Sequence, residues 1–268
     1  APTTLAMAQA KRPVTSRAAE NLFWLGRYTE RAENSIRLAQ IILRNLHGEE
    51  QTTRALQGWM SRLAVQHSLV AMHVPLPPLP ALSAQPAAHG HAPANTHASS
   101  PAPNSHTQVL RVFERSLIAA LGDAQSSYSV GFNLQALRLA AANVRERLSQ
   151  EQRNLIERAE TEFLDQCSDV DADTETAPQE ALNALEAASE WLAGITGAQT
   201  DRMVRDNGWR LLSIGRHIER LTTLAQAMRQ AFESGSVHEH AGFEALVALF
   251  DSTITFHAQY QQRRDTVA

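Results

Sequence analysis

Apolar residues recur at steps of three and four through most of this chain, which is the spacing of one face of an α-helix. The longest such run begins near Ser16 and stops near Gly48, with a regular apolar seam made of Leu22, Leu25, Thr29, Ala32, Ile36, Ala39, Leu43 and Leu46. Alternating runs of Val, Ile and Thr, which would indicate strands, are absent from the sequence. The pattern therefore predicts an all-α protein, a bundle of about seven to eight helices.

Further helices are expected over about residues 49–72, 108–121, 133–148, 149–167, 178–196, 200–235 and 241–260. Local signals set several of these limits. Ser149 and Gln152 have the spacing of a capping box, and Pro178 suits the first turn of a helix. Gly197 and Gly235 are typical helix ends, so we expect one helix to stop at each.

Two segments fall outside the helical pattern. Residues 74–107 hold eight of the eleven prolines, among mainly small and polar residues. Such a segment cannot bury enough apolar area to offset the entropy cost of ordering it. We therefore expect a disordered insert over 74–107, a flexible tail or linker over 1–15, and one helical domain over 16–268.

The charge balance and the single cysteine narrow the classes of function. The 268 residues carry 24 Lys and Arg against 28 Asp and Glu, a net charge of −4, so nucleic acid is not an expected partner. No apolar run approaches the ~20 residues that a membrane span needs, so no membrane association is expected. The lone Cys167 excludes an internal disulfide and fits a reducing compartment, which favours a cytoplasmic location.

Familiar catalytic and metal-binding motifs are not found in the sequence. It has no Gly-rich phosphate loop, no Gly-x-Ser-x-Gly elbow and no His-Glu-x-x-His. The acidic stretch 169–180 has part of a calcium-loop spacing, but Thr174 stands where that loop needs glycine and Pro178 falls inside it. We therefore expect no metal site and no cofactor in this chain.

One motif occurs twice. Both Gly26–Arg31 and Gly215–Arg220 read Gly-Arg-x-x-Glu-Arg behind an apolar turn, at an offset of 189 residues. The apolar seam repeats at the same offset, as Leu211, Ile214, Ile218, Leu221, Ala225, Met228 and Phe232. A shared motif in a shared register predicts two related halves around a pseudo-two-fold axis, with the two helices in contact near the two glycines.

The charged residues of the repeat lie on a second, partly apolar face of the first helix. Opposite the seam, that face carries Phe23, Leu38 and Ile41 together with Arg27, Glu30, Arg31 and Asn34. A helix that is apolar on two sides runs through the centre of a bundle, where charged side chains must pair. We expect them to join their counterparts Arg216, Glu219 and Arg220 across the pseudo-axis in one buried cluster.

Three interpretations of this cluster are open. It is a structural ion-pair network, or an anion or carboxylate site that uses the excess of arginine, or a catalytic centre. Arginine is a poor general base, which disfavours the third interpretation. Further arginines that could join the cluster are Arg138, Arg145 and Arg205.

Three separated segments resemble the bacterial alpha-E domain, a helical family named for its Glu-Arg motif. They are Ser16–Ala39, Ala142–Ser149 and Met203–Arg220, and the resemblance covers most of the chain except the Pro/His-rich insert. The family pattern continues into further helices after one like Phe243–Arg264, so we expect a truncated C-terminal end, and the N-terminal tail would fit excision from a fusion. The resemblance implies association with a circularly permuted ATP-grasp ligase and often with a transglutaminase-like protein.

The function expected from these observations is that of a helical accessory or binding domain. It would work with an ATP-grasp-type peptide or amide ligase, by binding the ligase, a peptide substrate, or both. ATP and Mg would then belong to the partner ligase, in the same chain or a separate one. The alternatives are an enzyme that uses the Arg/Glu cluster itself, and a purely structural oligomerisation module.

Overall fold

The computed structural model describes residues 14–47, 53–77, 103–125 and 129–260. In these ranges the chain forms nine α-helices, two short 3₁₀ helices and no strand, so the predicted all-α fold is confirmed. None of the described helices is long and apolar enough to cross a membrane.

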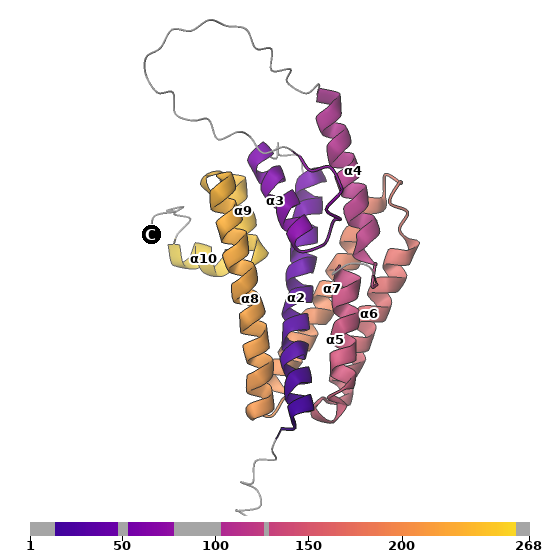
Figure 1. The fold of residues 1–268 in the computed structure, drawn as a ribbon, viewed down its shortest axis with the longest axis vertical. Coiled ribbons are helices and arrows are strands. Elements are labelled where there is room, and N and C mark those ends of the chain that lie inside the picture. Colours follow the sequence, from indigo (N-terminus) through magenta and orange to yellow (C-terminus); the bar gives the residue numbers. More distant parts are fainter. Residues whose placement is uncertain (1–13, 48–52, 78–102, 126–128, 261–268) are drawn as a thin grey trace, which may run out of the picture.

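The helices follow one another as an elongated bundle (Figure 1). In chain order they are α2 (Ser16–His47), α3 (Arg54–Gln66), α4 (Pro103–Leu121), α5 (Val130–Ala142), η1 (Arg145–Arg147), α6 (Gln150–Asp169), α7 (Ala177–Asp201), α8 (Asn207–Ser234), η2 (Ser236–His238), α9 (His240–Leu249) and α10 (Thr253–Tyr260).

Helix α2 runs through the centre of the bundle. It lies between α8 on one side and α5 and α7 on the other, and α8 runs beside it in the same direction (Figure 1). Its apolar seam is buried from Leu22 to Leu43, as the spacing predicts. The opposite face, which carries Glu30 and Asn34, is buried as well. Helix α2 is therefore covered on two sides.

The repeated glycines mark the closest approach of α2 and α8. A methyl group added at Gly26 would lie 2.0 Å from the carbonyl oxygen of Leu212, and one added at Gly215 would lie 2.2 Å from that of Phe23. Each glycine thus faces the backbone of the opposite helix one turn from its counterpart. This reciprocal contact is the local pseudo-two-fold axis that the repeat predicts.

The pseudo-symmetry extends to the helices that follow. Helix α3 packs on α8, where the Trp59 indole donates a hydrogen bond of 3.2 Å to the Ala227 carbonyl, and α9 packs on α2. Helices α5 and α7 cover the α2 seam. The equivalent seam of α8 is exposed along Ile214, Ile218, Leu221, Met228 and Phe232.

Several predicted limits differ from the observed ones. Helix α7 runs through Gly197 to Asp201, and α5 ends at Ala142, so the predicted stop at 197 and the single helix over 133–148 are wrong. The predicted last helix is two helices, because Asp251 adopts a left-handed φ of 51° between them. Gly235, with a φ of 74°, does end α8.

The structure describes parts of the two segments that were predicted to be non-helical, the tail over 1–15 and the insert over 74–107. Val74 and Pro77 are buried, and α4 begins at Pro103, so residues 74–77 and 103–107 belong to the fold rather than to an insert. Val14 packs against the core and Thr15 caps α2, which corrects the end of the predicted tail. The remainders of these two predictions, residues 78–102 and 1–13, lie outside the described residues.

Candidate functional site

Six charged side chains from α2 and α8 form a reciprocal set of ion pairs. We name it the crossed network, and it consists of Arg27, Glu30, Arg31, Arg216, Glu219 and Arg220. Each carboxylate accepts from two arginines of the opposite helix. The repeat makes this possible, because it places glutamate and arginine at matching heights on two helices in register.

Glu219 is held by the arginines of α2. The guanidinium of Arg31 binds it bidentately, with Nε 2.8 Å from Oε1 and Nη2 2.9 Å from Oε2, and Arg27 Nε donates to Oε2 at 2.8 Å. Burial alone would raise the pKa of Glu219, but the hydrogen bonds and charges of Arg31 and Arg27 outweigh it and hold that pKa below its usual value. Glu219 therefore stays ionised.

Glu30 is held in the same way by the arginines of α8. Arg220 binds it bidentately, with Nε 2.7 Å from Oε1 and Nη2 3.0 Å from Oε2, and Arg216 Nη2 lies 3.4 Å from Oε2. Glu30 is 1% exposed, while the side chain of Arg220 is 47% exposed. The expected burial thus holds for the carboxylate, but Arg220 reaches solvent.

Asn34 extends the network by one turn. It is 3% exposed, and its Nδ2 lies 3.4 Å from the hydroxyl of Thr223, its counterpart at the repeat offset. Its Oδ1 is buried without a hydrogen-bond partner. The buried Asn34 amide, which lies between α2 and α8, therefore makes a hydrogen bond through its nitrogen but not through its oxygen.

Aromatic rings cover one side of the network. The Arg27 guanidinium lies 5.3 Å from the centre of the Trp24 ring, and that of Arg31 lies 5.7 Å from the centre of the Tyr28 ring. Nearby, burial lowers the pKa of His67 against the opposing charge of Glu219, so its imidazole is neutral at pH 7. The two arginines on this side are therefore partly covered, each with 23% of its side chain exposed.

A cleft opens on the other side of the network, between α2, α7, α8 and α9. It has a volume of about 640 Å³, and we name it the arginine cleft. Its charged lining residues are Glu33, Arg37, Arg44, Arg216, Arg220 and Asp251. Four guanidinium groups and two carboxylates line the cleft, and the buried Glu30 binds two of these guanidinium groups, so one positive charge is left in excess.

Glu33 sits between the arginines of the cleft. It accepts a hydrogen bond from the Thr196 hydroxyl of α7, and its carboxylate oxygens lie 3.6 Å from Arg37 and 3.7 Å from Arg216. Burial raises the pKa of Glu33 above its usual value, although Arg216 and Thr196 oppose that shift. A proton on Glu33 would increase the positive excess of the cleft.

The arginine cleft has the chemistry of an anion site. A guanidinium binds a carboxylate or phosphate through a planar fork of N–H donors and keeps its charge at every physiological pH. Arg44 is exposed at the rim, where its charge is available to a ligand. In the described part of the chain, no group of three or more His, Cys, Asp or Glu could hold a metal ion.

The three additional arginines make other contacts. Arg138 pairs with Glu160 of α6, and the guanidinium of Arg205 lies 5.3 Å from the ring centre of Trp209. Arg145 is exposed in η1, because the helix that should have put it on the same side as Arg138 ends before it. These three arginines, which the sequence offered only as possible additions to the cluster, thus lie outside the crossed network.

Sequence reasoning missed four charged residues of the cleft, which are Asp251 and, on α2, Glu33, Arg37 and Arg44. A signal for the three on α2 was present. Glu33 and Arg37 are four residues apart, and Arg44 follows two turns later on the same side of α2. The sequence did not indicate that α7 and α9 would complete the walls of the arginine cleft around these residues.

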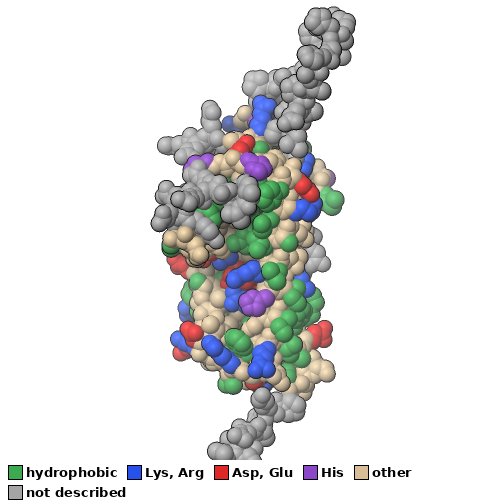
Figure 2. Space-filling model, turned by 90° about the vertical axis from the view of Figure 1, so that its left-hand side faces the viewer, with side chains coloured by type: hydrophobic (Ala, Val, Ile, Leu, Met, Phe, Trp, Pro, Cys, Tyr) green, Lys and Arg blue, Asp and Glu red, His purple; other side chains and the backbone are tan. Residues whose placement is uncertain are grey.

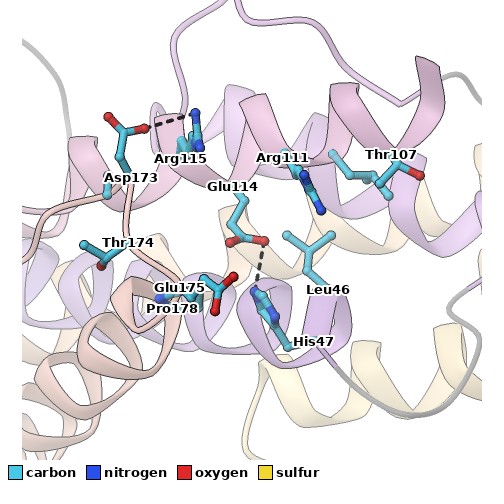
Figure 3. A pocket seen from close by; sticks show the side chains of 12 residues that line it. Leu46, His47, Thr107, Arg111, Glu114, Arg115, Asp173, Thr174, Glu175 and Pro178 are labelled. Atoms are coloured by element: carbon cyan, nitrogen blue, oxygen red, sulfur yellow. Dashed lines mark ion pairs between the residues drawn. The ribbon is translucent and has the colours of Figure 1, made fainter. Parts of the chain in front are cut away.

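Another cavity, of about 530 Å³, lies between the end of α2, α4 and the segment before α7 (Figure 3). His47 lies 2.9 Å from Glu114, and Arg115 pairs with Asp173 at 3.0 Å. Glu175 adds a third carboxylate to a lining that holds two arginines. Because its carboxylates outnumber its arginines, this cavity is a weaker anion site than the arginine cleft.

Relatives of this chain are found in mycobacteria. Uncharacterised proteins of Mycobacterium tuberculosis and Mycobacterium bovis are 27% identical to it over 248 residues. The match covers 90% of this chain, and the chain spans only 25% of the length of those relatives. No solved structure was found to match it.

A family model matches nearly the whole chain. It covers residues 14–267 and is described as a predicted alpha-helical domain with a conserved ER motif. The Glu30–Arg31 and Glu219–Arg220 dipeptides at the centre of the crossed network fit that description. The chain belongs to the Alpha-E family.

Proposed function

We propose that this chain is a helical binding module of an ATP-grasp-type peptide or amide ligase, and that its arginine cleft binds the carboxylate of a ligase substrate. The observation that carries the proposal is the excess of guanidinium groups over carboxylates in one cleft. Such a ligase joins a carboxylate to an amine, and a carboxylate is one of the groups that arginine binds through two parallel N–H···O bonds. ATP and Mg would be bound by the ligase, and a transglutaminase-like protein is a further proposed partner.

The crossed network itself suits a structural role better than a catalytic one. A general base needs a pKa near the working pH, whereas the pKa of Glu219 is held low by Arg31 and Arg27. Both network carboxylates are occupied by guanidinium groups of the opposite helix. The network therefore fixes the register of α2 and α8, and so positions Arg216 and Arg220 in the cleft.

Binding to the cleft is tested with a short peptide that has a free C-terminal carboxylate, measured by isothermal titration calorimetry. Replacing Arg44 by Ala is expected to weaken this binding by tenfold or more, since a hydrogen bond to a charged group contributes about 1.5–3 kcal/mol. The matched control is Arg62→Ala, which removes an exposed arginine of α3 outside the cleft. Equal affinity for the C-terminally amidated peptide would contradict carboxylate recognition.

The same binding is expected to strengthen as the pH falls through the pKa of Glu33. Protonation removes a negative charge beside Arg37 and Arg216, while the peptide carboxylate, with its own pKa near 3.5, stays ionised above about pH 5. In a Glu33→Gln protein the pH dependence should be lost and the affinity should be high throughout. A Glu33→Gln protein that keeps the slope of the parent protein would exclude this cause.

The partnership is tested separately with an ATP-grasp-type ligase encoded by a neighbouring gene. The chain is expected to co-purify with that ligase and to raise its rate of ATP-dependent amide formation. The Arg44→Ala protein should still co-purify but should stimulate less, whereas Arg62→Ala should behave as the parent. Absence of both complex and stimulation would overturn the partnership and leave carboxylate binding to be judged by calorimetry.

A further inference from the structure

The cavity between the end of α2, α4 and the segment before α7 combines an apolar lining with charges of both signs (Figure 3). We name it the α4 cavity. Its volume of about 530 Å³ lies within the range of roughly 300–1,000 Å³ that small-molecule sites occupy. Its apolar lining residues are Leu46, Leu110, Ala172 and Pro178.

This lining differs from the exposed apolar seam of α8. Figure 2 shows hydrophobic side chains along much of the face on which α8 lies, where they cover an outer surface. In the α4 cavity the apolar side chains share one recess with charged groups. Ligand pockets have this composition, in which apolar walls hold the ligand and a few polar groups orient it.

Two charged groups of the α4 cavity remain after its two ion pairs have formed. They are the guanidinium of Arg111 and the carboxylate of Glu175, and neither has an ion-pair partner in the described part of the chain. Figure 3 shows them on either side of the paired His47 and Glu114, with Arg111 coming from α4 and Glu175 from the segment before α7. One cavity therefore carries an available charge of each sign.

Glu114 offers a second carboxylate oxygen to the cavity. Its Oε2 lies 2.9 Å from His47, while its Oε1 has no hydrogen-bond partner among the described residues. In Figure 3 the carboxyl groups of Glu114 and Glu175 both point into the cavity. An ammonium group has three N–H donors and no acceptor, so it can donate to both carboxylates at once.

We propose that the α4 cavity binds a free α-amino acid with an aliphatic side chain, in its zwitterionic form. Arg111 binds the carboxylate through its planar fork of donors, and Glu175 and Glu114 accept from the ammonium group. The aliphatic side chain packs against Leu46 and Leu110. The inference does not rest on the proposed function, because the α4 cavity and the arginine cleft share no lining residue.

The charge balance of the lining favours a zwitterion over a simple ion. An anion beside Arg111 would share the cavity with three carboxylates, and a cation beside Glu175 would share it with two arginines. An amino acid brings one charge of each sign to the two available groups. It therefore gains both attractions and adds no net charge to the cavity.

The test is isothermal titration calorimetry of the full chain with L-leucine and with two analogues. Leucinamide lacks the carboxylate, and N-acetylleucine lacks the ammonium group. Each analogue is expected to bind at least tenfold more weakly than leucine, because it loses charge-assisted hydrogen bonds. Leucinamide that binds as tightly as leucine would overturn the role of Arg111, and N-acetylleucine that does so would overturn the role of the glutamates.

Variants assign each charge of the ligand to a residue. Arg111→Ala should weaken leucine binding at least tenfold and remove the preference for leucine over leucinamide. Glu175→Gln should also weaken it and reduce the preference over N-acetylleucine. Both residues are exposed, and circular dichroism establishes that each variant is folded. The matched controls Arg62→Ala and Glu180→Gln change exposed residues outside the cavity and should bind leucine as the parent does.

Arg44→Ala distinguishes the α4 cavity from the arginine cleft. This variant should bind leucine as the parent does, whereas loss of leucine binding would place the leucine carboxylate in the cleft and overturn the α4 cavity as its site. Arg111→Ala should in turn leave binding of the C-terminal peptide unchanged, so the two sites fail independently. A parent chain that binds no leucine up to its solubility, or Arg111→Ala and Glu175→Gln proteins with unchanged affinity, would overturn the inference.

Discussion

Replacing Glu30 by Gln is expected to lower the free energy of unfolding by about 3 kcal/mol, because breaking a buried ion pair leaves its partners uncompensated. Glu30 is 1% exposed and accepts from both Arg220 and Arg216. Glutamine offers one oxygen and no charge, so the bidentate contact with Arg220 is lost. Arg216, which is mostly buried, then keeps only the more distant Glu33 at 3.7 Å. Urea unfolding followed by circular dichroism gives the change.

The control for this substitution is Glu233→Gln. Glu233 pairs with Arg229 in the same helix, but both side chains are more than half exposed. A pair of this kind contributes at most about 0.5 kcal/mol. If Glu30→Gln proved as mild as Glu233→Gln, the crossed network would not be needed for stability, and its role in fixing the register of α2 and α8 would have to be abandoned.

Replacing Gly26 by Ala is expected to destabilise the fold by about 3 kcal/mol, at the upper end of the cost of overpacking. The added methyl group would lie 2.0 Å from a backbone carbonyl oxygen of α8, and a backbone cannot move aside as a side chain does. The two helices must therefore separate, which also lengthens the ion pairs of the crossed network. Gly215→Ala should have a similar effect, since the contact of Gly215 with the Phe23 carbonyl is related by the pseudo-two-fold axis to that of Gly26 with the Leu212 carbonyl.

Gly197→Ala is the matched control for these two substitutions. Gly197 also lies inside a helix, but no atom would lie within 4 Å of an added methyl group. Alanine is the better helix former by roughly 1 kcal/mol, so this protein should be slightly more stable than the parent. Thermal unfolding of the three variants side by side measures the difference. Equal melting temperatures for all three would show that α2 and α8 tolerate a wider spacing.

The pairing of α2 with α8 could be predicted from the sequence because the same Gly-Arg-x-x-Glu-Arg motif occurs in both helices. The same motif at a constant offset puts Glu30 at the height of Arg216 and Arg220, and Glu219 at the height of Arg27 and Arg31. Two helices in register can then satisfy both carboxylates at once. Residue spacing determines that geometry, so no knowledge of the remaining helices was needed.

Other features depend on contacts that spacing does not encode. Gly197 and Gly235 are the same residue type, yet only Gly235 adopts a left-handed φ and ends its helix. Glycine permits that conformation without requiring it. The exposed seam of α8 is another case, because a heptad pattern identifies an apolar face but not what covers it. The arginine cleft likewise needs walls from α7 and α9, which come from distant parts of the chain.

The distance along the chain between α2 and α8 has a consequence for synthesis. At about 5–20 residues per second, a ribosome takes roughly 10 to 30 seconds to extend the chain from His47 to Asn207. During that interval the seam of α2 can collapse first onto α5 and, near the end of the interval, onto α7, but its other face has no partner. That face carries Arg27, Glu30 and Arg31, whose charges favour contact with water over burial without a partner. We therefore expect the charges that pair α2 with α8 in the folded protein also to disfavour association of this face before α8 is made.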